Sequence, residues 1–123
     1  MDNPKFQVFK DTRNEFRFRL RAKNGEIILH SSEGYSSKQG CLDGIASVKV
    51  NAPYDSRYYR GVGQNGQYYF TLNAVNGKTL GMSEMYTTTY SRDNGIEAVK
   101  RDAPNAPVED LTVNQQSSLY NWK

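Results

Sequence analysis

Short stretches in which apolar and polar residues alternate recur along the chain, and this pattern predicts β-strands that bury one face. It is clearest over 16–22, where Phe, Phe, Leu and Ala alternate with three arginines, and the same apolar spacing returns over 68–74. Less regular apolar stretches predict further strands at 6–10, 27–31, 57–60, 79–82 and 108–113. Two-residue hairpin turns, in which both positions take positive φ, are predicted at Asn24-Gly25, Asn65-Gly66 and Asn76-Gly77.

Two other stretches carry the pattern of a helix. Cys41, Ile45 and Val48 recur with helical spacing and form an apolar stripe. Each helix is bounded by a hydroxyl N-cap residue and a terminating proline, which are Ser37 and Pro53 in the first stretch and Thr88 and Pro104 in the second. Gly44 and Gly95 lie inside these helices, where each costs about 1 kcal/mol relative to alanine. We therefore expect a close approach of helix and sheet at both glycines.

The chain repeats itself once. Residues 18–25 align with 70–77, and 44–49 align with 95–100. We align Ser32-Glu33 with Ser83-Glu84, which puts a one-residue gap between the Asn-Gly turn and the Ser-Glu pair. Two copies are too few for a solenoid. The predicted fold is α+β, with tandem β-β-β-α-β repeats that form one mainly antiparallel sheet and two helices on one face of it.

The expected organisation is one pseudo-twofold domain made of residues 1–56 and 57–111, followed by a flexible tail over 112–123. The segments 15–28, 32–38 and 44–49 resemble the YegP-like family of small uncharacterised bacterial proteins. This resemblance implies a duplicated unit in which the strand that follows the helix of one unit joins the sheet of the other, with 108–111 as such a closing strand. It also implies a monomer that is an intrachain pseudo-dimer. The family brings no established activity, so no catalytic residue is transferred.

Composition narrows the class of protein. Hydrophobic residues make up 37% and aromatic residues 12% of 123 residues, which is typical of a folded domain, and no apolar run is long enough to cross a membrane. One cysteine and one histidine exclude an internal disulfide and cannot form a four-ligand zinc site. These features predict a cytoplasmic protein with no metal and no cofactor. The formal net charge of +3 is carried by the first 53 residues, which permits a polyanionic partner.

The best candidate for binding is the set of alternating arginines Arg17, Arg19 and Arg21, called the arginine row below. Alternate residues of a strand lie about 6.6 Å apart on one face. With Tyr69 of the second repeat, the arginine row could bind single-stranded nucleic acid or another polyanion, with phosphates on arginine and a base on tyrosine. The alternative is a solvated strand face whose charges pair with Glu15 or Glu26.

A second candidate lies between the third strand and the helix of each repeat, and is called the junction below. Its residues are Glu33 and Tyr35 in the first repeat and Glu84 and Tyr86 in the second. The glutamates could act as bases or ligands in a pocket. The alternative, which repetition in both halves favours, is structural: serine and glutamate satisfy backbone N–H groups at the helix entrance, and tyrosine packs beneath.

A thiolate–imidazole pair is the remaining catalytic hypothesis, and it would need Cys41 and His30 together. Cys41 lies on the apolar stripe and is predicted to be a core residue, whereas the orientation of His30 is open. We therefore predict no enzyme. The expected function is a binding or interaction module of the bacterial cytosol, with nucleic acid or another polyanion as partner and no membrane. The alternative is a small-molecule binder or minor enzyme that uses the junction.

Overall fold

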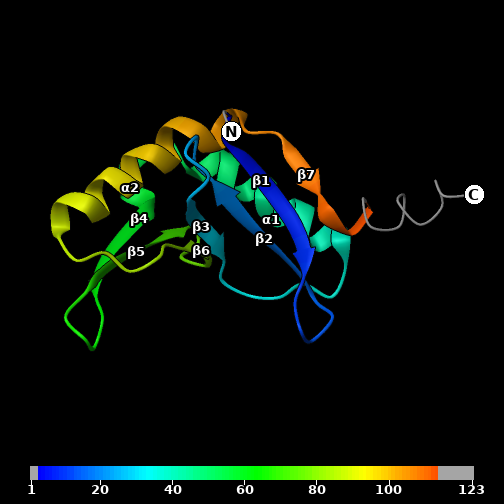
Figure 1. Ribbon diagram of the computed structural model, residues 1–123, viewed down its shortest axis with the longest axis horizontal. Helices are drawn as coiled ribbons and strands as arrows, with labels where there is room; N and C mark the ends of the chain where they lie inside the picture. The colour runs from blue at the N-terminus through cyan, green and yellow to red at the C-terminus, as the bar shows by residue number, and fades with distance from the viewer. Residues whose placement is uncertain (1–2, 114–123) are drawn as a thin grey trace, which may run out of the picture.

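A computed structural model describes residues 3–113 of the chain, which form seven strands, two α-helices and two short 3-10 helices. The elements follow one another as β1 (Lys5–Lys10), β2 (Phe16–Arg21), β3 (Ile27–Ser31), α1 (Lys38–Asn51), η1 (Asp55–Arg57), β4 (Tyr58–Val62), β5 (Tyr68–Asn73), β6 (Thr79–Met82), α2 (Thr89–Asp102), η2 (Ala103–Asn105) and β7 (Val108–Asp110). The strands make one sheet in the order β4-β5-β6-β3-β2-β1-β7 (Figure 1). Among these seven strands only the β1–β7 pair is parallel, so the predicted α+β fold with a mainly antiparallel sheet is confirmed.

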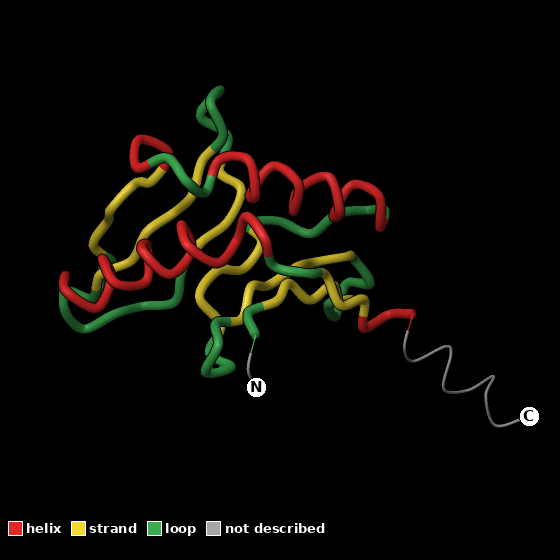
Figure 2. Tube along the Cα trace, turned by 90° about the horizontal axis from the view of Figure 1, so that it is seen from above, coloured by secondary structure: helices red, strands yellow, loops and turns green. Residues whose placement is uncertain are grey.

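The two repeats meet where β3 pairs with β6, at the centre of the sheet. The helices cross this boundary: α1 contacts β2 of its own repeat and β5 and β6 of the other, and α2 contacts β5 and β3. Figure 2 shows the two helices and the strands of the sheet from above. The strand after α2 joins the other repeat, since β7 pairs with β1, whereas β4, which follows α1, is the counterpart of β1 and pairs with β5 of its own repeat. The two repeats therefore share one interior.

The apolar face of the sheet packs against both helices, and its core side chains are fully buried in each repeat. Phe18 and Leu20 of β2 and their counterparts Phe70 and Leu72 of β5 have no exposed surface. Alternation along the strands thus places the arginine row on the opposite face of β2, as predicted. Of the predicted flexible tail, residues 114–123 lie outside the described residues.

The helix glycines are explained by aromatic side chains from the junction. A Cβ atom at Gly44 would lie 2.6 Å from the hydroxyl oxygen of Tyr35 and 3.3 Å from the ring of Phe18. At Gly95, the same atom would lie 2.5 Å from the hydroxyl oxygen of Tyr86. The close approach predicted for these glycines is therefore real, and the tyrosine rings contribute as much to it as the sheet does.

The turn prediction was wrong in type. Gly25, Gly66 and Gly77 have positive φ, but none of the preceding asparagines does. The amide of Gly25 donates to Ala22 and the amide of Ala22 donates to Glu26, at 2.9 and 2.8 Å, which closes a three-residue loop. This is a type I turn followed by a left-handed residue, for which glycine alone needs the unusual conformation.

The internal alignment also needs one correction. The amide of Phe18 donates to the hydroxyl of Ser31, and the amide of Phe70 donates to the hydroxyl of Ser83. Ser83 is therefore the counterpart of Ser31, and the extra residue of the first repeat lies after Ser31, within 32–34. Ser32-Glu33 and Ser83-Glu84 are therefore alike in sequence but do not occupy equivalent positions in the two repeats.

Cys41 and His30 lie on opposite sides of the sheet. Cys41 is fully buried in the core between helix and sheet, as predicted. His30 pairs with Arg19 across β2 and β3, so it lies on the face of the arginine row and is half-buried there. The sheet separates the two groups, and no thiolate–imidazole pair forms.

We predict that Gly44→Ala destabilises the protein although alanine favours helix by about 1 kcal/mol. Overpacking against Tyr35 and Phe18 costs about 1 to 3 kcal/mol, so a net loss of up to about 2 kcal/mol is expected in urea unfolding. Tyr35→Phe removes the nearest atom, so the same glycine substitution should cost less in that background. A Gly44→Ala protein more stable than the wild type would contradict the packing explanation.

Cys41 is predicted to be unreactive in the folded protein. Burial, with a smaller effect of Asp110, raises the pKa of the Cys41 thiol to about 11. At pH 8.5 its alkylation by iodoacetamide should be about 100-fold slower than in urea, because little thiolate is present. Cys41 is the only cysteine, so no other thiol contributes. The contribution of the neutral, buried thiol to the free energy of unfolding is fully present below pH about 8.5 and is lost as the pH rises toward 11. Equal rates in the folded and unfolded chain would show that the thiol is accessible.

Candidate functional site

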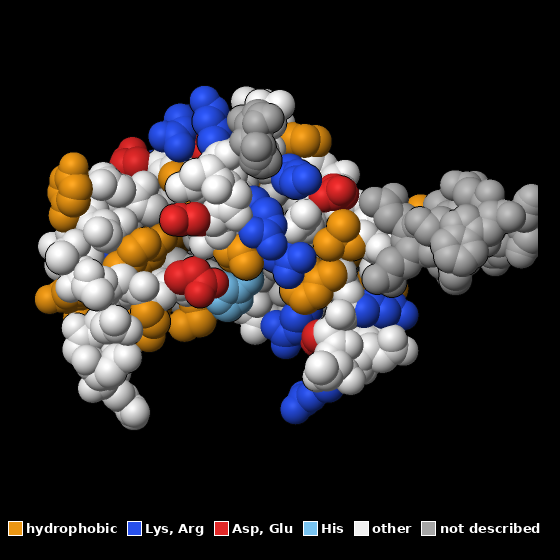
Figure 3. Space-filling view, in the orientation of Figure 1, with side chains coloured by type: hydrophobic (Ala, Val, Ile, Leu, Met, Phe, Trp, Pro, Cys, Tyr) orange, Lys and Arg blue, Asp and Glu red, His pale blue; other side chains and the backbone are white. Residues whose placement is uncertain are grey.

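The candidate site lies on the face of the sheet that the helices leave uncovered, called the open face below. The strand register aligns one residue from every strand across it, in the order Tyr59, Thr71, Met82, His30, Arg19, Gln7 and Glu109. Cross-strand partners point to the same side of a sheet, so these seven side chains form a continuous line from β4 to β7. Basic side chains gather over β2 near the middle of this face (Figure 3).

Arg17 is neutralised by an aspartate that the sequence analysis did not select. Its Nε donates to a carboxylate oxygen of Asp11 at 2.7 Å. The amides of Arg13 and Glu15 also donate to Asp11, and these hydrogen bonds together with Arg17 hold the pKa of the Asp11 carboxyl below its ordinary value. The charge of Arg17 is therefore satisfied within the β1–β2 hairpin, by Asp11 and not by Glu15.

Arg19 and Arg21 are held by a neutral side chain instead. The Nε atoms of both arginines donate to the same oxygen, Oε1 of Gln7, at 2.9 and 2.8 Å. Arg19 also lies over the ring of Phe9, with 4.5 Å between its Cζ and the ring centroid, and Arg21 donates from Nη1 to the carbonyl of Gly25 at 2.6 Å. Within residues 3–113, no carboxylate lies within ion-pair distance of either guanidinium.

This arrangement leaves two positive charges close together. Two Nε atoms on one acceptor lie less than about 6 Å apart, and unit charges at that separation repel by roughly 1 kcal/mol in water and roughly 3 kcal/mol at an effective dielectric constant of 20. Partial burial, and then the charge of Arg21, lower the pKa of the Arg19 guanidinium, while Glu109 opposes this shift. Arg19 still stays protonated, so the pair forms a local positive centre.

Tyr69 does not lie beside the arginine row. It belongs to β5, and β6 and β3 stand between it and β2, which corresponds to about 14 Å. Its ring covers Gly61, where a Cβ atom would lie 2.5 Å from it, and it packs against Tyr59 with ring centroids 6.3 Å apart. The open face therefore has a basic region over β2 and a separate aromatic end at β4 and β5.

The junction tyrosines are structural. Tyr35 stacks on Phe18 with ring centroids 6.4 Å apart, and Tyr86 stacks on Phe70 at 6.5 Å. Their backbones form bridges with Phe16 and Tyr68, which tie each junction to the sheet. Both hydroxyls lie against a helix glycine, so the two side chains connect sheet and helix.

The junction glutamates do not serve the helix entrance as expected. The hydroxyls of Ser37 and Thr88 cap the helices, as predicted, by accepting from the amides of Gly40 and Ser91. Glu33 instead pairs with Lys78, with 3.4 Å between Nζ and Oε2. The predicted backbone role of Ser-Glu at the helix N-terminus is wrong, because the capping residues lie four residues further along the chain.

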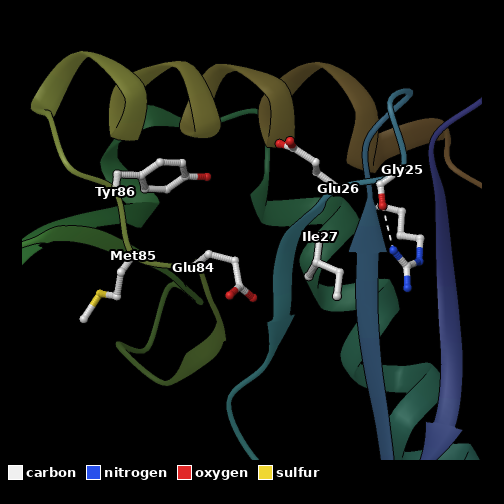
Figure 4. Close-up of a pocket in the computed structure, with 7 residues that line it drawn as sticks. Gly25, Glu26, Ile27, Glu84, Met85 and Tyr86 are labelled. Carbon is white, nitrogen blue, oxygen red and sulfur yellow. Dashed lines mark hydrogen bonds between the residues drawn. The ribbon is translucent and has the colours of Figure 1, made fainter.

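Glu84 faces a groove of about 420 Å³ between the second junction and the β2–β3 turn. In Figure 4, Glu26 and Glu84 point into the space between these two segments, and the Tyr86 hydroxyl points the same way. Burial, followed by the charges of Glu84 and Glu26, raises the pKa of Tyr86. The counterpart of Glu26 in the second repeat is Lys78, so among the described residues the first junction has an ion pair with Lys78, whereas the second junction faces another carboxylate.

Sequence analysis missed the residues that define the basic centre. Gln7 is 8% exposed although it lies on the open face, and nothing in its own strand marks an uncharged amide as the acceptor for two arginines. Asp11 could have been found from its position six residues before Arg17 across a tight hairpin. Over residues 3–113, no three His, Cys, Asp or Glu side chains are grouped to hold a metal, and no helix has the length and apolar character of a membrane span.

Known proteins resemble this chain over most of its length. A family model described as "Domain of unknown function (DUF1508)" matches it twice, over residues 11–58 and 64–110. A UPF0339 protein of Bordetella pertussis is 52% identical over 105 residues, which are 85% of this chain and 94% of that protein. The UPF0339 protein YegP of Escherichia coli is 45% identical over 107 residues, covering 87% of this chain and 96% of YegP.

Solved structures of two relatives share the fold. The solution structure of YegP from E. coli has a TM-score of 0.83 at 42% identity and covers 90% of this chain and 95% of that one. The solution structure of a UPF0339 protein from Shewanella oneidensis has a TM-score of 0.82 at 39% identity, covering 89% and 92%. The two matched repeats, the curated relatives and the shared fold together show that this chain belongs to the DUF1508 family, as a two-repeat protein of the YegP (UPF0339) type.

Proposed function

We propose that the protein is a non-enzymatic binding module of the bacterial cytosol whose open face binds a polyanion, with single-stranded nucleic acid as the partner. The observation that carries this proposal is the pair Arg19 and Arg21, whose charges are held by a neutral amide and a backbone carbonyl. Among residues 3–113 this positive centre has no carboxylate within ion-pair distance, and such a centre attracts phosphate, since guanidinium groups bind phosphate oxygens through short charge-assisted hydrogen bonds.

The aromatic end of the open face favours a polynucleotide over a small ion as the partner. Tyr59 is 56% exposed and packs against Tyr69, and both lie on the same face as the arginine pair. An extended polynucleotide that crosses the strands could place phosphates at Arg19 and Arg21 and stack a base on Tyr59, four strands and about 19 Å away. Base stacking on tyrosine is tolerant of sequence, so binding with little base preference is expected.

The test is fluorescence anisotropy with a labelled single-stranded oligothymidylate at low salt. Arg19→Ser and Arg21→Ser should each weaken binding by about tenfold, because each removes hydrogen bonds from a charged donor. Arg17→Ser is the matched control: it removes the same charge from the same strand and face, but from an arginine already paired with Asp11. It should change the affinity by less than about twofold. Melting curves of all three variants check that the fold is kept.

The salt dependence provides an independent measure. Two phosphate contacts on a single strand predict a slope of about −1.4 in a plot of log affinity against log salt concentration. If Arg17→Ser and Arg19→Ser lose equal affinity, binding depends on the overall positive charge of the open face and not on the pair Arg19 and Arg21. No binding by the wild type at low salt would overturn the proposed function.

The groove at the second junction favours one other function, a small-molecule binder that uses Glu84. The groove is large enough for a small ligand, and its lining includes two carboxylates, Tyr86, Met85 and Arg21 of the arginine row. On this hypothesis, native mass spectrometry of protein purified from cells detects a retained metabolite, and Glu84→Gln removes it. Glu33→Gln is the control, because Glu33 is paired with Lys78. A wild-type spectrum that shows only the bare chain would count against this function.

A further inference from the structure

We propose that Arg19 and Arg21 bind one phosphate-type oxyanion between them, and that Gln7 is the positioning residue that creates this site. This inference rests on the proposed polyanion-binding function and names the group that the open face recognises. The site is a phosphate site and not only a basic surface, because a buried side chain fixes the two guanidinium groups in relation to each other.

Gln7 is unusual for the open face because it is buried there, with 8% of its surface exposed. Its Oε1 accepts from Nε of both arginines, and its Nε2 donates to Oε1 of Glu109 at 2.8 Å. Every polar atom of the amide is therefore used. Glu109 also fixes which way the amide points, since the NH₂ group must face the carboxylate and the oxygen must face the arginines.

The hydrogen bonds to Gln7 use only the inner edge of each guanidinium. Among the described residues, the two Nη atoms of Arg19 make no hydrogen bond, and Arg21 uses Nη1 alone, toward Gly25. The donors that remain belong to two neighbouring guanidinium groups on the same face. A tetrahedral oxyanion has enough oxygen atoms to accept from both groups at once, which is how arginine commonly binds phosphate.

The neutrality of Gln7 is essential to this site. Arg17 gives the comparison within the same strand: its Nε also donates to a side-chain oxygen, but that oxygen belongs to the carboxylate of Asp11 and neutralises the charge. An amide oxygen fixes the guanidinium groups in the same manner and leaves both charges available. Replacing the Gln7 amide by a carboxylate should therefore keep the arrangement and remove the attraction for phosphate.

The experiment follows the side-chain Nε–Hε signals of Arg19 and Arg21 by NMR during titration with inorganic phosphate at constant ionic strength, with chloride as the compensating salt. The decisive variant is the double exchange Gln7→Glu with Glu109→Gln, which leaves the net charge and the side-chain lengths unchanged. It moves one carboxylate from β7 to the arginine pair. We expect phosphate affinity to fall at least tenfold, and oligothymidylate affinity to fall with it. Arg17→Ser, which changes a neighbouring arginine that is already paired with Asp11, is the control and should retain phosphate binding.

The outcomes separate this inference from the proposed function. If the exchange variant binds phosphate as the wild type does, or if phosphate shifts neither arginine signal, the inference is overturned, even where oligothymidylate still binds. If phosphate binds and the exchange abolishes it while the wild type does not bind oligothymidylate, the site stands and the nucleic-acid function falls. A melting temperature of the exchange variant close to that of the wild type shows that the loss does not come from unfolding.

Discussion

The structure depends on the pairing of β3 with β6. Neither repeat can bury its apolar face by itself, because each helix packs partly on the strands of the other repeat. The β3–β6 pair joins three strands of the second repeat to the strands of the first, and it places His30 opposite its own counterpart Met82. A single continuous sheet then gives both helices one apolar surface to cover. Burial of that surface is the main source of stability for a domain of this size.

Both repeats have the same fold, but only the first repeat carries the arginine pair and its glutamine. In the strand register, Arg19 corresponds to Thr71, Arg21 to Asn73 and Gln7 to Tyr59. The core residues of the two central hairpin strands are the same in both repeats, with Phe18 and Leu20 in β2 and Phe70 and Leu72 in β5. The open faces of these strands differ, since one carries arginines and the other carries tyrosine, threonine and asparagine. This division is the physical basis for assigning binding to the open face and structure to the two junctions.

Much of the fold could be predicted from the sequence because the apolar periodicity was strong and occurred twice. The strands, the helix caps Ser37 and Thr88 and the packed helix glycines all follow from local pattern. The turn type could not be predicted, because an Asn-Gly pair fits both a two-residue and a three-residue loop, and Asn14 takes the left-handed conformation without a glycine. Tyr69 is separated from the arginine row because the repeats join through β3 and β6. This strand order could not be predicted, because alternation along one strand does not show which strands are neighbours.

The hydrogen bond between Gln7 and Glu109 joins residues 102 positions apart along the chain. During synthesis on the ribosome, β1 and β2 leave the exit tunnel long before β7, so the two arginines exist for some time without the strand that orients their glutamine. Contacts of such long sequence separation form late in folding, because the closure of a long loop must come first. The basic centre of the open face is consequently complete only once both repeats have been translated and assembled, which couples this centre to the integrity of the whole domain.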